Sequence, residues 1–209
     1  HLQNTMLKRF PFLDTLNLGG NQIAMIPANA FSSASLQRLV LSHKPITFIW
    51  QNAVFAIGNL KELLLSHTRL TTVGSHSMAI SSPYPMLKIH ISSSAISSIH
   101  PNAFGLTTPQ VLNLSHNNLT TLERFPFDAL IHLMLRNASR LSKPPILGVE
   151  GNPFTCRGGY YEWLIWLRLS WQIQRLVYGF RCPDGSGLPT LNFRQIACQW
   201  TSRNFAYLG

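Results

Sequence analysis

Aliphatic residues recur in this chain at one fixed spacing, and that spacing constrains the fold more than any other feature. The frame LxxLxLxxNxLxxI restarts seven times along the sequence. Its starts are Leu13, Leu36, Leu60, Met86, Pro109, Leu130 and Pro144. Successive starts lie 23, 24, 26, 23, 21 and 14 residues apart. Self-similarity at a period of roughly 20–50 residues indicates a repeat architecture, so we expect each restart to form one coil of a solenoid.

Within each frame, the segment LxL predicts a short strand whose leucines point into the coil, because successive strand side chains alternate between faces. The residue between the two leucines then points outward. These outward positions are Asn17, Val40, Leu64, His90, Asn113, Met134 and Gly148. A single coil cannot bury its own apolar face, so coils must stack on one another. We expect a parallel sheet along one face and looser coils behind it.

The N of the frame marks a turn at which the chain leaves the sheet. Its occupants are Asn21, Lys44, Thr68, Ser94, Asn117, Ala138 and Asn152. An asparagine amide both donates and accepts hydrogen bonds, so we expect it to bond backbone groups of its own coil and of the next one. Lys lacks an acceptor and Ala lacks both groups, which predicts that the second and sixth coils are less well held.

These columns resemble the leucine-rich repeat family, in its longer, extracellular type. The run GNPFTC that ends at Cys156, the aromatic segment after it, Cys182-Pro183 and a closing Cys198 resemble the cysteine-flanked C-terminal cap of such proteins. Toll-like and adhesion receptor ectodomains are of this kind. The resemblance implies an α/β solenoid, a right-handed horseshoe with a parallel sheet on its concave face. It divides the chain into repeats over residues 1–151 and a cap with a helix over 152–209.

The N-terminal end fits the tail of a coil, because Leu2 and Leu7 have the same five-residue spacing as Ile26 and Phe31. We therefore expect the chain to begin within a repeat, without an N-terminal cap, and to belong to a longer protein.

The resemblance also implies a disulfide between Cys156 and Cys182. The family opens its cap with two cysteines, but Gly158 stands at the second position. Cys198 is then left without its usual partner, either as a free or intermolecular thiol or as a buried inert one. The sequence alone also leaves a pairing of Cys156 with Cys198 open.

Disulfides and N-glycans both belong to secreted chains and receptor ectodomains, so an extracellular location is expected. The sequons N-x-[ST] start at Asn113, Asn118 and Asn137. Because Asn113 is expected on the sheet, we predict glycan occupancy at Asn118 or Asn137 first. No apolar run reaches the roughly 18 residues of a membrane-spanning helix.

Catalytic motifs are missing from the sequence: it contains no HExxH, GxxxxGK[ST], GxGxxG or CxxC. Three Ser-His pairs could suggest a hydrolase, and they lie at residues 42–43, 66–67 and 115–116. All three occupy the same repeat position, and nucleophilic catalysis also needs a base within reach and an orienting group. We therefore interpret them as part of the repeat and predict a protein that is not an enzyme and that carries no metal or cofactor.

The outward face of the sheet is the remaining candidate site. Apolar residues rimmed by polar ones suit a protein partner, and the predicted contact residues are Arg38, Val40, Lys61, Leu64, Lys88 and His90. The alternative partner is a polyanion, either nucleic acid or a sulfated glycan, because the formal net charge is +10. Such binding would weaken steeply with added salt, whereas a protein partner would be retained.

Overall fold

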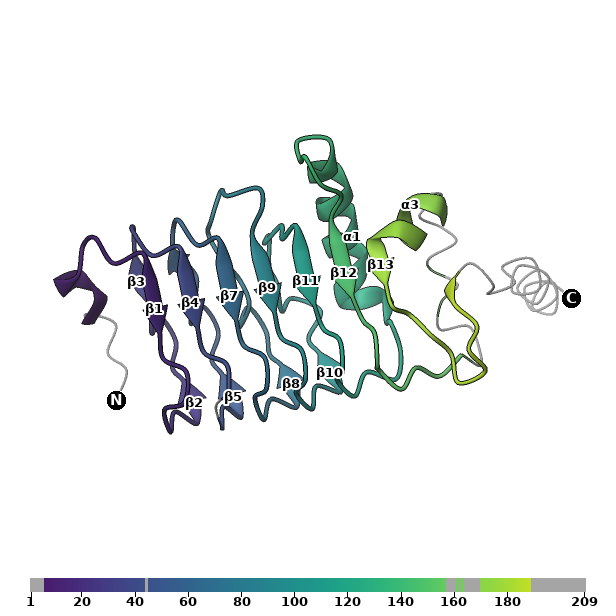
Figure 1. Ribbon diagram of the computed structural model, residues 1–209, viewed down its shortest axis with the longest axis horizontal. Helices are drawn as coiled ribbons and strands as arrows, with labels where there is room; N and C mark the ends of the chain where they lie inside the picture. The colour runs from purple at the N-terminus through teal and green to yellow at the C-terminus, as the bar shows by residue number, and fades with distance from the viewer. Residues whose placement is uncertain (1–5, 44, 157–160, 162, 164–169, 189–209) are drawn as a thin grey trace, which may run out of the picture.

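The computed structural model describes residues 6–43, 45–156, 161, 163 and 170–188. Within them, one parallel sheet of seven short strands runs along the molecule in chain order (Figure 1). Its strands are β1 (Thr15–Asn17), β4 (Arg38–Val40), β7 (Glu62–Leu64), β9 (Lys88–His90), β11 (Val111–Asn113), β12 (Ile146–Gly148) and β13 (Val177–Tyr178). From β1 to β12, each neighbouring pair is in register at the same frame position, for example Leu39 opposite Leu63. The chain is thus a solenoid, as the spacing predicted.

Shorter strand pairs and turns make up the rest of each coil. The pairs are β2 (Met25–Ile26) with β5 (Phe48–Ile49), β3 (Ser32–Ser33) with β6 (Ala56–Ile57), and β8 (Thr72–Val73) with β10 (Ser98–Ile99). A short 3-10 helix, η1 (Met6–Arg9), precedes β1. These elements surround a core that is closed on one side by the large sheet.

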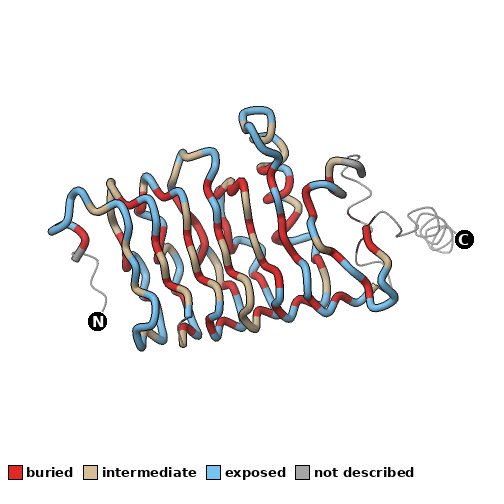
Figure 2. Tube along the Cα trace, viewed as in Figure 1, coloured by how far each residue is buried: buried red, intermediate tan, exposed pale blue. Residues whose placement is uncertain are grey.

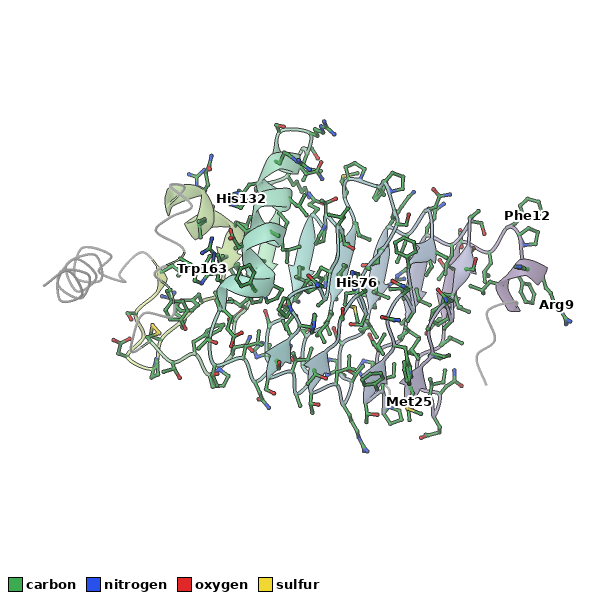
Figure 3. All side chains as sticks on the ribbon, turned by 180° about the vertical axis from the view of Figure 1, so that it is seen from behind. Arg9, Phe12, Met25, His76, His132 and Trp163 are labelled. Carbon is green, nitrogen blue, oxygen red and sulfur yellow. A yellow bond between two sulfur atoms is a disulfide. The ribbon has the colours of Figure 1, made fainter. Side chains whose placement is uncertain are left out.

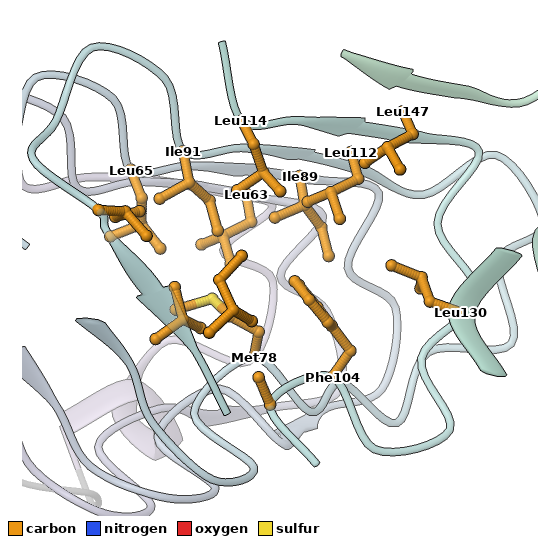
Figure 4. Packing of buried hydrophobic residues seen from close by; sticks show 14 of the residues in the cluster. Leu63, Leu65, Met78, Ile89, Ile91, Phe104, Leu112, Leu114, Leu130 and Leu147 are labelled. Carbon is orange, nitrogen blue, oxygen red and sulfur yellow. The ribbon is translucent and has the colours of Figure 1, made fainter. Parts of the chain in front are cut away.

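The core lies between the sheet and these outer segments (Figure 2). Leu39, Leu63, Ile89 and Leu112 have no exposed surface. Figure 4 shows inward side chains of successive strands in a row, with Met78 and Phe104 packing from the outer side. At roughly 1.5–3 kcal/mol for each fully buried aliphatic or aromatic side chain, this shared core is the main favourable term that holds the coils together.

Asparagines tie the coils together through the backbone. Asn117 donates to the carbonyls of Leu114 and Ile91 at 2.9 and 2.8 Å and accepts from the Ile96 amide at 3.1 Å. Asn152 likewise donates to Leu114 and accepts from the Leu119 amide. The bonds therefore reach the preceding coil, and the expectation of bonds to the next coil was wrong. The amide of Asn117 lies beside the corresponding turn of the preceding coil, so its hydrogen bonds reach the backbone there.

A residue with a left-handed backbone precedes every asparagine position of the frame except Ala138. His43, His67 and His116 have φ angles of 56°, 57° and 57°, and Gly20 and Gly151 have 74° and 70° in the same column. Left-handed conformations favour glycine and, among other residues, Asn, Asp and His. The repeated Ser-His pairs thus meet a backbone requirement.

The expected coil that starts at Leu130 is wrong, because a helix, α1 (Arg124–Ala138), occupies this stretch. Phe127, Leu130, Ile131 and Met134 follow helical spacing, and all four are buried. The strand frame would instead turn Leu130, Leu133 and Leu135 inward, and of these only Leu130 is buried. β11 therefore pairs directly with β12, with Val111 opposite Ile146. The 14-residue coil does not exist, and Ala138 is no turn residue.

The C-terminal part closes the solenoid with aromatic side chains. Phe154 stacks on Phe180 at 4.6 Å between ring centroids, and Tyr161 meets Phe180 edge-on at 5.1 Å. Burial raises the pKa of Tyr161 to about 12, so its hydroxyl stays protonated and donates to the Thr155 carbonyl. Trp163 donates to the Leu122 carbonyl at 2.8 Å. The Trp163 bond joins the segment to the coil before it.

A disulfide joins Cys156 to Cys182 across this segment. It encloses α3 (Ser170–Leu176) and β13, which adds the last strand to the sheet. Gly158 and Cys198 lie outside the described residues.

Candidate binding surface on the outward side of the sheet

The outward side of the large sheet, called here the sheet face, carries two parallel rows of side chains. One row is Thr15, Arg38, Glu62, Lys88, Val111 and Ile146, and the other is Asn17, Val40, Leu64, His90, Asn113 and Gly148. Neighbours in a row are about 4.8 Å apart, the spacing of paired strands. The rows exist because the central residue of each strand points inward and both flanking residues point out.

Charged groups meet in the middle of the first row. The Arg38 Nε lies 2.7 Å from a carboxylate oxygen of Glu62, and the His90 Nε2 lies 4.0 Å from the other. Lys88 stands opposite Glu62 on the next strand. The Arg38 side chain is 51% exposed, so the ion pair contributes only about 0.2–1 kcal/mol to stability. It orients the guanidinium over the face.

His90 is neutral at pH 7. Burial lowers its pKa, the Glu62 carboxylate opposes that shift, and the Lys88 ammonium adds to it. Since an unperturbed histidine titrates near pH 6.5, a lower pKa leaves the neutral ring dominant. His90 therefore offers a donor and an acceptor to a partner at neutral pH without adding positive charge.

Val40 and Leu64 form the apolar centre of the sheet face. They stand opposite each other on β4 and β7, and both are half-buried. His90 continues the same row on β9. A pair of aliphatic side chains within a polar row, beside a charged row, matches the usual anatomy of a protein contact.

Lys61 lies at the rim of this face. It precedes β7, and its ammonium sits 5.1 Å from the ring centroid of Tyr84, in the loop before β9. The two groups form a cation–π contact. The structure thus brings Arg38, Val40, Leu64 and the β9 pair together, with Lys61 beside them.

Three details differ from the sequence-based expectations. Met134 is fully buried in α1 and not on the sheet face. Gly148 is buried beside the Asn113 side chain. Glu62 is not among the predicted contact residues, yet it contacts two of them, Arg38 and His90. Its place two residues before Leu64 is the signal that could have identified it.

Histidines of adjacent turns also approach each other at the end of the strands. The rings of His43 and His67 stack at 4.5 Å between centroids. In the part of the chain that the structure describes, no three His, Cys, Asp or Glu side chains gather as metal ligands. None of the helices described there is both long and apolar enough to cross a membrane.

Comparison with known proteins agrees with this geometry. A family model described as leucine rich repeat matches residues 11–70, a stretch that contains β1, β4 and β7 with their turns. The chain folds as a leucine-rich repeat solenoid. The period in the sequence, the parallel sheet and the family model all describe the same repeats.

The leucine-rich repeat chain is 33% identical over 144 residues to Tsukushi from Xenopus tropicalis, which covers 66% of this chain and 41% of that protein. It therefore spans about two fifths of the length of this relative. Among solved structures, human 5T4 (Wnt-activated inhibitory factor 1, trophoblast glycoprotein) is 18% identical, with a TM-score of 0.37, over 87% of this chain and 86% of that chain.

Proposed function

We propose that this leucine-rich repeat chain is a non-catalytic, extracellular protein-binding module, part of a cell-surface receptor or a secreted adhesion protein. The contact residues are Arg38, Val40, Lys61, Leu64, Lys88 and His90, to which Glu62 is added. The division into repeats over residues 1–151 and a cap over 152–209 belongs to the same proposal.

The observation that carries the proposal is the in-register placement of Val40 beside Leu64, with the Arg38–Glu62 ion pair next to them. Val40 and Leu64 are only partly buried, so the exposed part of each side chain remains available to a partner. The rigid sheet holds them in place before binding, which lowers the entropy cost of association. An arginine at the centre of such a patch is a frequent hot spot.

The extracellular part of the proposal is supported by the Cys156–Cys182 disulfide. Disulfides persist in oxidising compartments and are rare in the cytosol. The three N-x-[ST] sequons are also typical of a secreted chain.

The sheet face can be tested with Leu64→Asp and a matched control, Leu106→Asp. Leu64 points away from the core, so the fold survives, but a carboxylate at the centre of the contact is desolvated without a partner. Leu106 is 88% exposed and lies between β10 and β11, away from the sheet face.

Wild type and variants are first used as baits to capture proteins from conditioned medium at elevated salt. Each protein that the wild type retains is then purified and titrated against the wild type and both variants. We expect Leu64→Asp to weaken binding by at least about 1 kcal/mol, roughly fivefold, and Leu106→Asp to leave it unchanged. A partner that binds Arg38→Ala and Leu64→Asp as tightly as the wild type would place the interface elsewhere.

A further inference from the structure

Three cations gather where α1 ends and the chain turns back toward β12. Arg136 lies in the last turn of α1, and Arg140 and Lys143 follow in the connecting segment. All three are exposed. We call Arg136, Arg140 and Lys143 the basic knob. In Figure 1 this helix end and its loop project beyond the edge of the sheet.

The backbone holds the basic knob in a defined shape. The amide of Arg140 donates to the Asn137 carbonyl at 3.0 Å, so the chain keeps turning past the helix end. Arg140 follows Arg136 by four residues and lies two residues past the end of α1. Gln110 donates to the Lys143 carbonyl at 3.2 Å, and Asn137 donates to the Pro85 carbonyl at 3.3 Å. These bonds fix the knob against β11 and the loop before β9.

No carboxylate neutralises the knob within the described residues. The sequence contains no Asp or Glu from residue 129 to 149. Asp128, eight residues before Arg136, is engaged by Arg124 at 3.1 Å and by His132 at 3.3 Å. Figure 3, which views the molecule from the side opposite to Figure 1, shows His132 on α1. The partial negative charge at the C-terminus of α1 stabilises the positive charge of Arg136. Lys143 lies too far beyond the helix end for the same effect.

Clustered, exposed cations repel one another and favour an anion that carries several charges. We propose that the basic knob binds a sulfated polysaccharide. This site lies outside the proposed contact residues, so it does not depend on the proposed protein interface. Sulfate groups along a flexible chain can each meet one cation, and that requires no deep pocket.

Nucleic acid fits this surface less well. Proteins that bind single strands stack bases on exposed aromatic rings, and residues 128–145 contain no Phe, Tyr or Trp. The nearest ring in the loop contacted by Asn137, that of Tyr84, is covered by the Lys61 ammonium. The knob thus offers charge without a stacking platform.

The test uses full-length chains that carry Ser139→Ala, which removes the sequon at Asn137 but keeps its amide. In this background the knob variant is Arg136→Gln, Arg140→Gln and Lys143→Gln. The matched control is Lys8→Gln, Arg9→Gln and Arg69→Gln, which removes the same charge from exposed positions elsewhere. Each protein is eluted from a heparin column with salt and titrated with a heparin oligosaccharide, with unsulfated dextran as the negative probe.

We expect the parent to elute above the physiological ionic strength of about 0.15 M and to ignore dextran. The knob variant should elute earlier and lose about tenfold in heparin affinity, since it lacks three charge contacts, while the control stays close to the parent. Equal losses of heparin affinity in the knob variant and in the control would show that net charge alone is responsible. Elution of the parent below that ionic strength would show that the chain has no heparin site. Tighter, knob-dependent binding of single-stranded DNA of equal charge would overturn the assignment to a sulfated glycan.

Discussion

Single polar side chains connect adjacent coils of this solenoid, and their contribution depends on burial. Asn117 is 3% exposed and bonds two carbonyls and an amide within the core edge. Asn21 occupies the same frame position in the first coil, but it is exposed, and within the described part of the chain its side chain donates only to the Leu18 carbonyl. Between them, Thr68 and Ser94 replace the amide with a hydroxyl pair at 2.8 Å.

Asn117→Ala should therefore lower the free energy of unfolding by about 2–4 kcal/mol, because it leaves buried backbone groups of two coils unpaired. Asn21→Ala, the control at the equivalent position, should cost less than about 1 kcal/mol. Urea denaturation of both variants measures the difference. Equal, small losses would mean that water replaces the Asn117 bonds and that this residue does not hold the coils together.

At the scale of elements, α1 and the C-terminal segment decide how the solenoid ends. α1 takes the place of a strand-forming coil because Phe127, Leu130, Ile131 and Met134 all reach the core in helical form. The disulfide then ties Cys156, which follows the last asparagine turn, to Cys182 beyond β13. Its two cysteines are 26 positions apart in the sequence.

Replacing both cysteines, Cys156→Ala with Cys182→Ala, should destabilise the chain by roughly 3 kcal/mol, the chain-entropy value for a loop of this length. Thermal unfolding should show a lower Tm for the variant under oxidising conditions and a smaller difference when the parent is reduced. Peptide mapping without reduction provides the direct check. Recovery of Cys156 and Cys182 as free thiols from secreted material would contradict the pairing.

At the scale of the whole molecule, the sequons lie on different sides of the solenoid. Asn113 is on the sheet face, where its side-chain oxygen accepts from the Ser115 amide at 3.0 Å and Ser115 is buried. Asn118 and Thr120 of the next sequon are both exposed. Asn137 is half-buried and donates to Pro85.

Mass spectrometry of material secreted from a eukaryotic cell should thus find a glycan at Asn118 in preference to Asn113. The physical reason is access, because a glycan must project from an exposed amide nitrogen into solvent. Thr120→Ala, which removes only the Asn118 sequon, should abolish most of the mass shift. Full occupancy at Asn113 would instead place a glycan on the sheet face and move the protein interface away from it.

The sequence by itself determined the repeat period, the inward leucine columns and the outward row that contains Val40 and Leu64, since strand side chains alternate between faces in each LxL segment. It also predicted the neighbours Val40 and Leu64, because equal frame positions stack in a parallel sheet. Tertiary structure decided what local pattern could not. Leu130 to Leu135 match both strand and helix spacing, and only packing against Phe127 and the core selects the helix. The meeting of Glu62 with Arg38 and His90 depends on three separate strands, and the basic knob depends on where that helix ends.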